Sequence, residues 1–270
     1  MNSNIIKKIK SLPPLDDTVI KIQRISTDKN SSMRDLVKVV EGDPMLTANI
    51  LKSANSPLYG FSKEIKSIGN AISLFGMATI RGFALSSAIK DNIKIDLSPY
   101  NIDNSSFLKI STIQNAIMLR WYSKVNRSML DILQPASFLM EVGKIIIAHE
   151  LIEQNLVDEF QNALKEEQNL EKLAQTEKEM VGFDSEEITA KIFEKWNLES
   201  ELIESIQFSN APQQADQHIQ EYAQALHVVK NSANIFGILQ EDQKKNSINL
   251  IEKYGLDPSL YEKALEQLDS

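Results

Sequence analysis

Side chains of the kinds that carry catalysis or bind metal ions are few in this chain. There is no cysteine, which excludes disulfides, thiolate zinc sites and a cysteine nucleophile. The three histidines, His149, His218 and His227, stand in no His-x-x-x-His, His-Asp or His-x-Glu pattern. His149-Glu150 comes closest to a pair of metal ligands, and we interpret His149 as an ordinary histidine of a helix surface or core.

Gly143-Lys144 invites comparison with a phosphate-binding loop. Ile145 follows where that loop needs Ser or Thr, and Phe138 stands where it needs its first glycine. The sequence also lacks a Gly-x-Ser-x-Gly elbow and a Gly-x-Gly-x-x-Gly turn. We therefore expect Lys144 to be structural, and no enzyme class finds a complete set of residues here.

The helices expected at residues 33–41 and 44–55 have the spacing of a helix-turn-helix. The second of them carries Lys52 as its one basic residue, which is too little charge to meet the phosphates of DNA. We interpret the pair as a packed helical hairpin. Nucleic acid is not an expected partner.

Charge is distributed unevenly along the 270 residues, whose net charge is −8. Residues 1–144 hold 19 basic and 12 acidic side chains, whereas residues 145–270 hold 10 and 25. A basic half can attract an acidic partner, but we favour the interpretation that it faces the chain's own acidic half. The apolar runs are too short to span a bilayer and no signal-peptide pattern is present. We expect a cytoplasmic protein without membrane association.

The segment from Asp43 to Gly60 carries strong local signals. Asp43 can cap a helix that begins at Pro44, where a missing N–H costs nothing. Asn55-Ser56-Pro57 ends this helix, and the loop around Tyr59 and Gly60 is too apolar to be a plain connector. We expect the loop to dock on the rest of the protein. The aromatic side chains expected in the core are Tyr59, Phe61, Phe75 and Phe83.

Apolar residues recur at helical spacing along the rest of the chain, and strand alternation is absent. A capping box at Ser32 and Asp35, a cap at Ser67 and terminating glycines at 76 and 182 mark several helix ends. Residues 93–104 read as a loop, and Pro135 is expected to help start a helix over 136–154. The remaining helices are predicted over 107–125 and 156–181, then from Ser185, near 202–206, over 222–236 and from Pro258.

Three stretches together resemble the HDOD family, a bacterial branch of the HD superfamily. They are Leu12-Pro13-Pro14, the run from Asp43-Pro44 to Tyr59-Gly60, and residues 65–76. The resemblance covers residues 12–212. It implies an all-α fold in which an N-terminal helical lobe, about 12–95, packs on a degenerate HD-type bundle, about 105–212. Residues 213–270 would form a C-terminal helical extension packed on this unit.

The resemblance also implies where metal ligands would stand in a catalytic HD protein. Ser111 occupies the place of the first histidine, and Met140-Glu141 occupies the place of the His-Asp pair. The other positions that often carry ligands read Ser185, Ser209, Asn210 and Asn234. Because the histidine and aspartate donors are missing, we expect no metal, no cofactor and no catalytic residue.

Three hypotheses of function follow from the resemblance. The first is a non-catalytic bacterial signalling module that contacts an unidentified signalling or regulatory protein. The second is a metal-dependent phosphohydrolase of a nucleotide or cyclic dinucleotide, in which Glu141 and His149 join rearranged ligands. The third is a nucleotide sensor without hydrolysis, which Arg120, Lys124 and Lys144 could serve if they converge. Asp43, Pro44, Asn55, Tyr59 and Gly60 would be structural or partner-contacting, and for Tyr59 both roles stay open.

Overall fold

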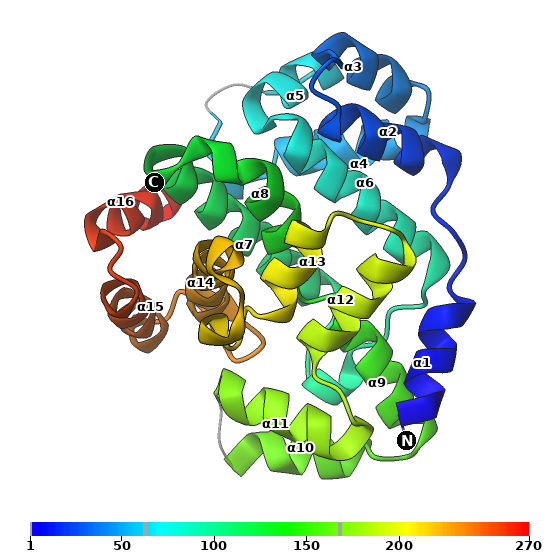
Figure 1. The fold of residues 1–270 in the computed structure, drawn as a ribbon, viewed down its shortest axis with the longest axis vertical. Coiled ribbons are helices and arrows are strands. Elements are labelled where there is room, and N and C mark those ends of the chain that lie inside the picture. The colour runs from blue at the N-terminus through cyan, green and yellow to red at the C-terminus, as the bar shows by residue number, and fades with distance from the viewer. Residues whose placement is uncertain (1, 62–63, 167–168, 270) are drawn as a thin grey trace.

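The computed structural model of the chain describes residues 2–61, 64–166 and 169–269. Within these residues the fold is helical throughout (Figure 1), apart from one pair of two-residue strands. The strands β1 (Ala233–Asn234) and β2 (Gly237–Ile238) pair antiparallel, with Ala233 opposite Ile238. The prediction of an all-α protein is confirmed.

The N-terminal part contains six α-helices and two single 3-10 turns in the described residues. These are α1 (Asn2–Ser11), α2 (Asp17–Thr27), α3 (Met33–Glu41), α4 (Pro44–Ala54), η1 (Pro57–Tyr59), α5 (Ile68–Phe75), α6 (Met77–Asn92) and η2 (Ser98–Tyr100).

The rest of the described chain forms the larger bundle. Its elements are α7 (Asn104–Val125), η3 (Arg127–Met129), α8 (Leu130–Leu139), α9 (Gly143–Glu153), α10 (Val157–Glu166), α11 (Leu170–Val181), α12 (Ser185–Lys195), α13 (Ser200–Gln207), η4 (Pro212–Gln214), α14 (Gln217–Ser232), α15 (Glu241–Lys253) and α16 (Pro258–Asp269).

Local sequence signals set many of the helix ends. Asp43 accepts a hydrogen bond from the Leu46 N–H at 2.9 Å, and Pro44 is the first residue of α4. Ser32 and Asp35 form the predicted capping box at the start of α3. The Ser67 side chain caps α5, which ends at the Gly76 backbone, as expected. These termini need no tertiary contact to be specified.

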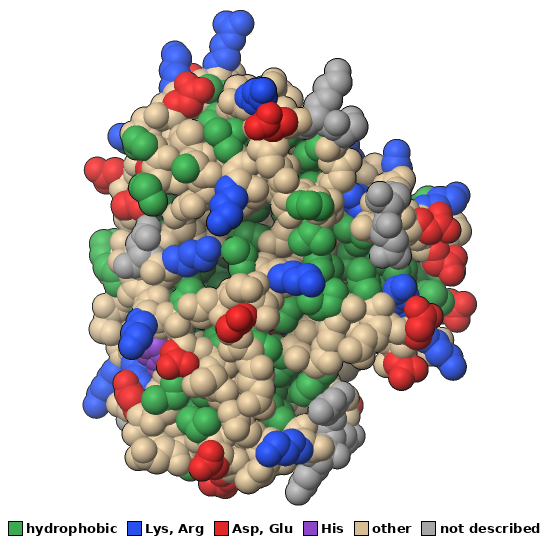
Figure 2. All heavy atoms as spheres, turned by 180° about the vertical axis from the view of Figure 1, so that it is seen from behind, with side chains coloured by type: hydrophobic (Ala, Val, Ile, Leu, Met, Phe, Trp, Pro, Cys, Tyr) green, Lys and Arg blue, Asp and Glu red, His purple; other side chains and the backbone are tan. Residues whose placement is uncertain are grey.

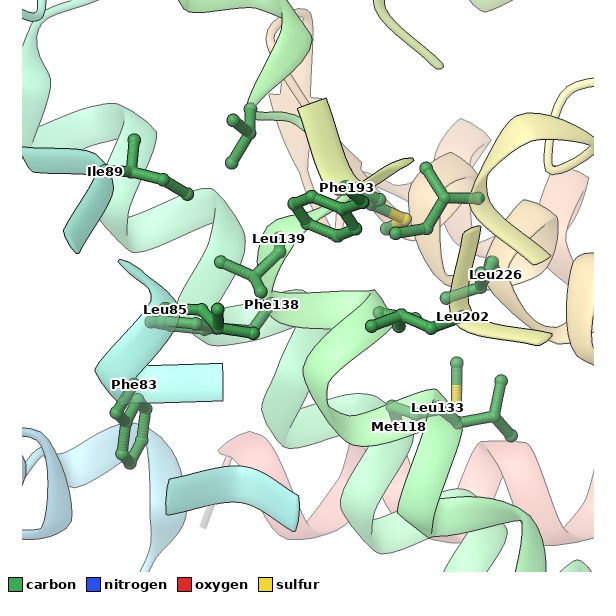
Figure 3. Close-up of a cluster of buried hydrophobic side chains, with 14 of the residues drawn as sticks. Phe83, Leu85, Ile89, Met118, Leu133, Phe138, Leu139, Phe193, Leu202 and Leu226 are labelled. Atoms are coloured by element: carbon green, nitrogen blue, oxygen red, sulfur yellow. The ribbon is translucent and has the colours of Figure 1, made fainter. Parts of the chain in front are cut away.

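The core runs without interruption through both parts of the molecule. In Figure 3, Leu85 and Ile89 of α6 lie beside Phe138 and Leu139 of α8. The rings of Phe83 and Phe138 also meet edge to face, with their centroids 5.0 Å apart. Beyond them the core continues to residues of the later helices, which are Met118 of α7, Leu133 of α8, Phe193 of α12, Leu202 of α13 and Leu226 of α14. Helix α8 therefore lies at the centre, covered by α6 and α7 and by α13 and α14.

Two terminal segments pack back onto this bundle. Helix α1 lies against α9 and α12, and the Trp196 indole N–H donates to the Pro13 carbonyl at 3.1 Å. Helix α16 covers α7, where the rings of Trp121 and Tyr261 meet edge to face at 5.3 Å. Both the Pro13 segment and the C-terminal helices are thus part of one packed unit.

The structure differs from the predicted helices in four places. The helix predicted over 222–236 is α14, which ends at Ser232, and the β1–β2 hairpin follows it. Residues 136–154 are not one helix, because Pro135 lies inside α8 and the chain turns at residues 140–142 before α9. Residues 156–181 form α10 and α11, and the Asn169 side chain caps α11 by accepting from the Lys172 N–H at 2.8 Å. Helix α1 was not predicted. The turn at 140–142 is followed by the close packing of α9 on α12, at Gly143.

No single helix among the described residues has the length and apolarity needed to cross a bilayer. Helices α5 and α6 meet these criteria only as a pair, and they are bent by 113° relative to each other.

Candidate functional site

A buried ion pair lies where α9 packs against α12. The Lys144 ammonium is 2.7 Å from Glu141 Oε2 and donates to the Ser185 hydroxyl at 2.8 Å. The Lys144 and Glu141 side chains are 1% and 2% exposed. Two of the degenerate positions, Glu141 and Ser185, are thus brought together by Lys144.

Gly143 makes this contact possible. A Cβ atom at Gly143 would lie 1.9 Å from the Ser185 carbonyl oxygen, so any larger residue would push α9 away from α12. The Gly143 N–H instead donates to Thr189 Oγ1 at 2.8 Å. Gly143 and Lys144 therefore have structural roles. Gly143 allows α9 to approach α12 closely, and the Lys144 side chain is buried in the core.

Three further side chains, Gln114, Glu177 and Tyr100, surround the Lys144–Glu141 ion pair. Gln114 donates to Glu141 Oε1 at 3.0 Å and to the Ala233 carbonyl at 2.8 Å. Glu177 accepts from the Tyr100 hydroxyl at 2.9 Å and from the Ser185 N–H at 2.8 Å. The Lys144 ammonium also lies over the Tyr100 ring, 5.9 Å from its centroid.

A second buried lysine extends the network toward α14. Lys230 forms an ion pair with Glu186 and donates to Asn210 Oδ1 at 3.0 Å. Asn210 in turn donates to Glu186 Oε2 at 2.7 Å, and the Asn234 amide donates to the Lys230 carbonyl at 3.1 Å. We call Glu141, Lys144, Glu177, Glu186 and Lys230 the buried ionic centre.

The charges of this centre depend on one another. Burial opposes ionisation of Glu141, but Lys144 and Lys230 outweigh it and lower the pKa of Glu141 to about 2. Burial also opposes the charge of Lys144, whose pKa is nevertheless raised because Glu141 and Glu177 are close. Burial, aided by the like charge of Lys144, lowers the pKa of Lys230 to about 8. The same desolvation raises the pKa of Glu177.

The residues of the centre do not fit a divalent metal ion. In the described part of the chain, no three His, Cys, Asp or Glu side chains gather in an arrangement that could hold one. The ammonium groups of Lys144 and Lys230 form ion pairs with Glu141 and Glu186, whose carboxylate oxygens a metal ion would need as ligands. A lysine ammonium group has no lone pair with which to bind a cation. The cationic role in this core belongs to Lys144 and Lys230.

Other residues singled out from the sequence lie outside the centre. Ser111 lies on the wall of an apolar cavity between α6, α7 and α8, and the Ser209 hydroxyl donates to the Ile206 carbonyl at 2.8 Å. Met140 is a buried core residue. His149 Nε2 contacts the Lys94 carbonyl, which satisfies this ring nitrogen on the outer side of α9.

Arg120 and Lys124 do not meet Lys144. They line a separate cavity of about 500 Å³ together with Arg127, between α7 and the start of α6. Lys144 is buried elsewhere, with its donors used by Glu141 and Ser185. The convergence that the nucleotide-sensor hypothesis requires is therefore absent from the geometry.

The segment from Asp43 to Gly60 is fastened to the core. The Asn55 amide donates to the Leu51 and Ile65 carbonyls at 2.9 Å each, and its oxygen accepts from the Ile65 N–H at 2.8 Å. Tyr59 is 5% exposed and donates to Asn115 Oδ1 at 3.0 Å. Gly60 has φ 62°, and a Cβ there would lie 2.6 Å from Arg120 Nη2. This geometry favours a structural role for both Asn55 and Tyr59.

Three of the five residues of the buried ionic centre, Glu177, Glu186 and Lys230, were not predicted from the sequence as site residues. Lys230 continues the apolar stripe of Leu226 and Ala233 at helical spacing, and Glu177 stands midway between Leu173 and Val181 on the buried face of α11. A charged residue at an apolar stripe position predicts a buried charge that needs a partner. The positions of Lys230 and Glu177 therefore predict that both charges are buried, but they do not identify the residues with which the two side chains pair.

Comparison with known proteins gives a consistent family and fold. The family model described as HDOD domain matches residues 12–212. A virulence factor from Campylobacter jejuni is 29% identical, with 99% of this chain and 94% of that chain covered at a TM-score of 0.59. No curated protein matches the chain.

Two further solved structures share the fold at lower identity. A candidate phosphohydrolase from Shewanella amazonensis is 21% identical, covering 99% of this chain and 96% of that one at a TM-score of 0.74. An HDOD domain protein of unknown function from Geobacter sulfurreducens is 17% identical, with the same coverages and a TM-score of 0.68.

Proposed function

Because the chain belongs to the HDOD domain family, we propose that it is a non-catalytic regulatory module of bacterial signal transduction. It would act in the cytoplasm by contacting another signalling or regulatory protein. The proposal goes beyond the family and the fold in one respect, which is that the protein catalyses no reaction.

The buried ionic centre carries this proposal. A metal-dependent hydrolase needs carboxylates and imidazoles that are open to an ion, together with a coordination position for water or substrate. At the degenerate positions this chain places Glu141 under Lys144 and Asn210 beside Lys230. Both lysines are fully buried, so substrate would have to displace a satisfied ion pair to enter. This arrangement supports a non-catalytic role, because lysine ammonium groups already pair with the carboxylates that a metal ion would need.

The names of similar structures do not distinguish a regulatory module from a phosphohydrolase. One neighbour is named a candidate phosphohydrolase and another, from Marinobacter aquaeolei, a candidate signal transduction protein. Each is 21% identical to this chain, so each supports the fold alone. The choice between the two functions therefore rests on the side chains of this protein.

Metal content and hydrolysis test the proposal directly. Protein purified without a metal-binding tag is analysed for iron, manganese and zinc, then assayed with a chromogenic phosphodiester, a phosphomonoester and cyclic dinucleotides. We expect substoichiometric metal and no turnover above the buffer control. One equivalent of metal, with turnover lost on chelation and in both Glu141→Gln and His149→Ala, would overturn it.

Partner binding is tested separately on the same preparation. Affinity capture from the source cell, followed by reconstitution with the purified candidate, should give a complex of fixed stoichiometry that survives chelation. The matched control is the same capture with heat-unfolded protein. Failure to recover any stoichiometric partner would remove the contact mechanism while leaving the metal result unchanged.

A further inference from the structure

Two adjoining cavities lie between α4, α6 and α7. Their volumes are about 340 and 450 Å³, and they share five lining residues, Ser86, Lys90, Ser105, Leu108 and Phe138. Together they have the size of a small-molecule site. We call them the α4–α7 groove, because α4, α6 and α7 provide most of the walls.

The two halves of the groove differ in chemistry. The smaller half carries more polar groups than the larger one, although Leu58, Phe83, Leu108 and Phe138 also line it. Its hydroxyl groups and amide come from α4, α6 and α7 and from Ser56, and the residues are Asn49, Ser53, Ser56, Ser86, Ser87, Ser105 and Thr112. The larger half is mainly aliphatic, lined by Ile89, Ile93, Ile95, Leu139, Val142 and Ile145, with Phe107 and Phe138 beside them. An occupant that satisfies both halves needs a polar end and an apolar end.

The charge of the groove has one sign. Lys52, Lys90, Lys94 and Lys109 line it, and among its described lining residues there is no Asp or Glu. Figure 2 shows the face opposite to the view of Figure 1, on which hydrophobic side chains lie among lysine and arginine side chains. Lysines beside hydroxyl groups favour a carboxylate or phosphate at the polar end. This basic surface belongs to a chain whose net charge is −8, so it is a local departure from the whole.

The apolar half distinguishes between ligand classes. A nucleobase needs hydrogen-bond partners for its edge and a flat aromatic surface for its face. The larger cavity offers chiefly branched aliphatic walls, which suit a hydrocarbon chain. Leu108, 37% exposed, lies at the junction of the two halves, where it can contact both parts of such a ligand.

From these observations we infer that the α4–α7 groove binds a single-chain anionic amphiphile, with its acyl chain in the larger cavity and its carboxylate or phosphate among the lysines. This binding function is independent of the proposed contact with a partner protein. The head group has two possible sources, a fatty acid or a phosphorylated lipid, and their shared chemistry is an anion on a hydrocarbon chain.

Calorimetric titration with dodecanoate, dodecyl phosphate, dodecanol and inorganic phosphate, each below its micelle concentration, tests the inference. We expect one molecule of either dodecyl anion per chain, at least tenfold weaker binding of dodecanol, and no saturable binding of phosphate alone. Tighter binding of one anion identifies the source of the head group. Equal affinity for dodecanol, or failure of both anions to bind, would overturn the inference.

Variants locate the site. Leu108→Glu places a negative charge at the junction and should weaken binding of the dodecyl anions at least tenfold, whereas Ile20→Glu, at a 49% exposed site on α2, should not. Ser105→Glu repeats the test at another exposed wall position if Leu108→Glu does not fold. Lys52→Glu with Lys109→Glu should also weaken binding, and Lys21→Glu with Lys38→Glu is the control of equal charge.

Unaltered binding in the groove variants would refute the assigned site, even if the anions bind. Saturable binding of an acidic amphipathic peptide in place of the dodecyl anions would refute the ligand class. Neither result changes the expected metal content or partner capture. A failure of the ligand-binding inference can therefore be distinguished from a failure of the proposed function.

Discussion

Lys144→Met removes the ammonium at the centre of the buried network and keeps an unbranched side chain of similar length. In the variant, the Gln114 amide still donates to Glu141, but Ser185 loses the hydrogen bond that Lys144 donates at 2.8 Å. A carboxylate would then be buried without its counter-charge. We expect the variant to fold less stably, with no effect that depends on a ligand.

The magnitude follows from the structure in two ways. Removing one partner of a buried ion pair costs about 3 to 5 kcal/mol. Separately, the pKa of Glu141 is about 2 in the folded protein against an ordinary 4.5. A difference of that size is worth about 3 kcal/mol at neutral pH. We therefore expect Lys144→Met to lower the free energy of unfolding by about 3 kcal/mol.

The pH dependence has a definite sign. The pKa of Glu141 is lower in the folded protein than in the unfolded chain, so its contribution is fully present above about pH 4.5 and declines as pH falls toward 2. Lys144→Met should show a smaller loss of stability over that range than the unaltered protein. The difference between the two unfolding curves isolates this contribution from other carboxylates.

Urea unfolding followed by circular dichroism measures these values at several pH values. Glu141→Gln keeps the acceptor that Gln114 uses, so the double variant with Lys144→Met should recover at least about 2 kcal/mol of the summed single costs. Lys124→Met, at a lysine outside the ionic centre, is the control. A cost below about 1 kcal/mol for Lys144→Met, or strict additivity with Glu141→Gln, would refute this account of the centre.

Three further outcomes are expected. Asn55→Ala should lower the free energy of unfolding by about 1 to 3 kcal/mol, because the Ile65 N–H loses its acceptor; an unaltered thermal melt would contradict this. Tyr59→Ala should cost about 3 kcal/mol or more and Tyr59→Phe about 1, measured by urea unfolding; equal melts with loss of partner capture would instead make Tyr59 a contact residue. Burial lowers the pKa of His227 to about 4, so its contribution is present above about pH 6.5 and declines toward pH 4, by about 1 to 3 kcal/mol. His227→Gln, compared with the unaltered protein over that range, should remove this decline, and a difference that does not change with pH would count against it.

The sequence by itself determined the fold class and most local boundaries. The Ser32 capping box, the Asp43-Pro44 start and the Gly76 end were predicted from residues a few positions apart, because a cap needs only its own first or last turn. The helical spacing of apolar residues likewise fixed which faces are buried, including Tyr59, Phe75 and the aromatic cluster around them.

The boundaries that failed depend on distant partners. At the turn between α8 and α9, Gly143 lies against the Ser185 carbonyl, 42 positions away, and no local signal encodes that contact. The predicted start of a helix at Pro135 also failed. Pro135 lies inside α8 and packs on Gly82 of α6, and the Asp131 carbonyl, which a helical proline cannot bond, accepts from Arg81 at 2.8 Å.

The same distinction applies to the functional residues. The resemblance to the HDOD family implied the positions at which HD-type metal ligands would stand, and the side chain at each of these positions could be checked in the sequence. Glu141 and Lys144 are only three residues apart, but the tertiary structure alone brought Lys144 to Ser185 and Lys230 to Glu186, because those partners lie on different helices. Burial decides the energy of such contacts through desolvation, and burial is a property of the packed molecule.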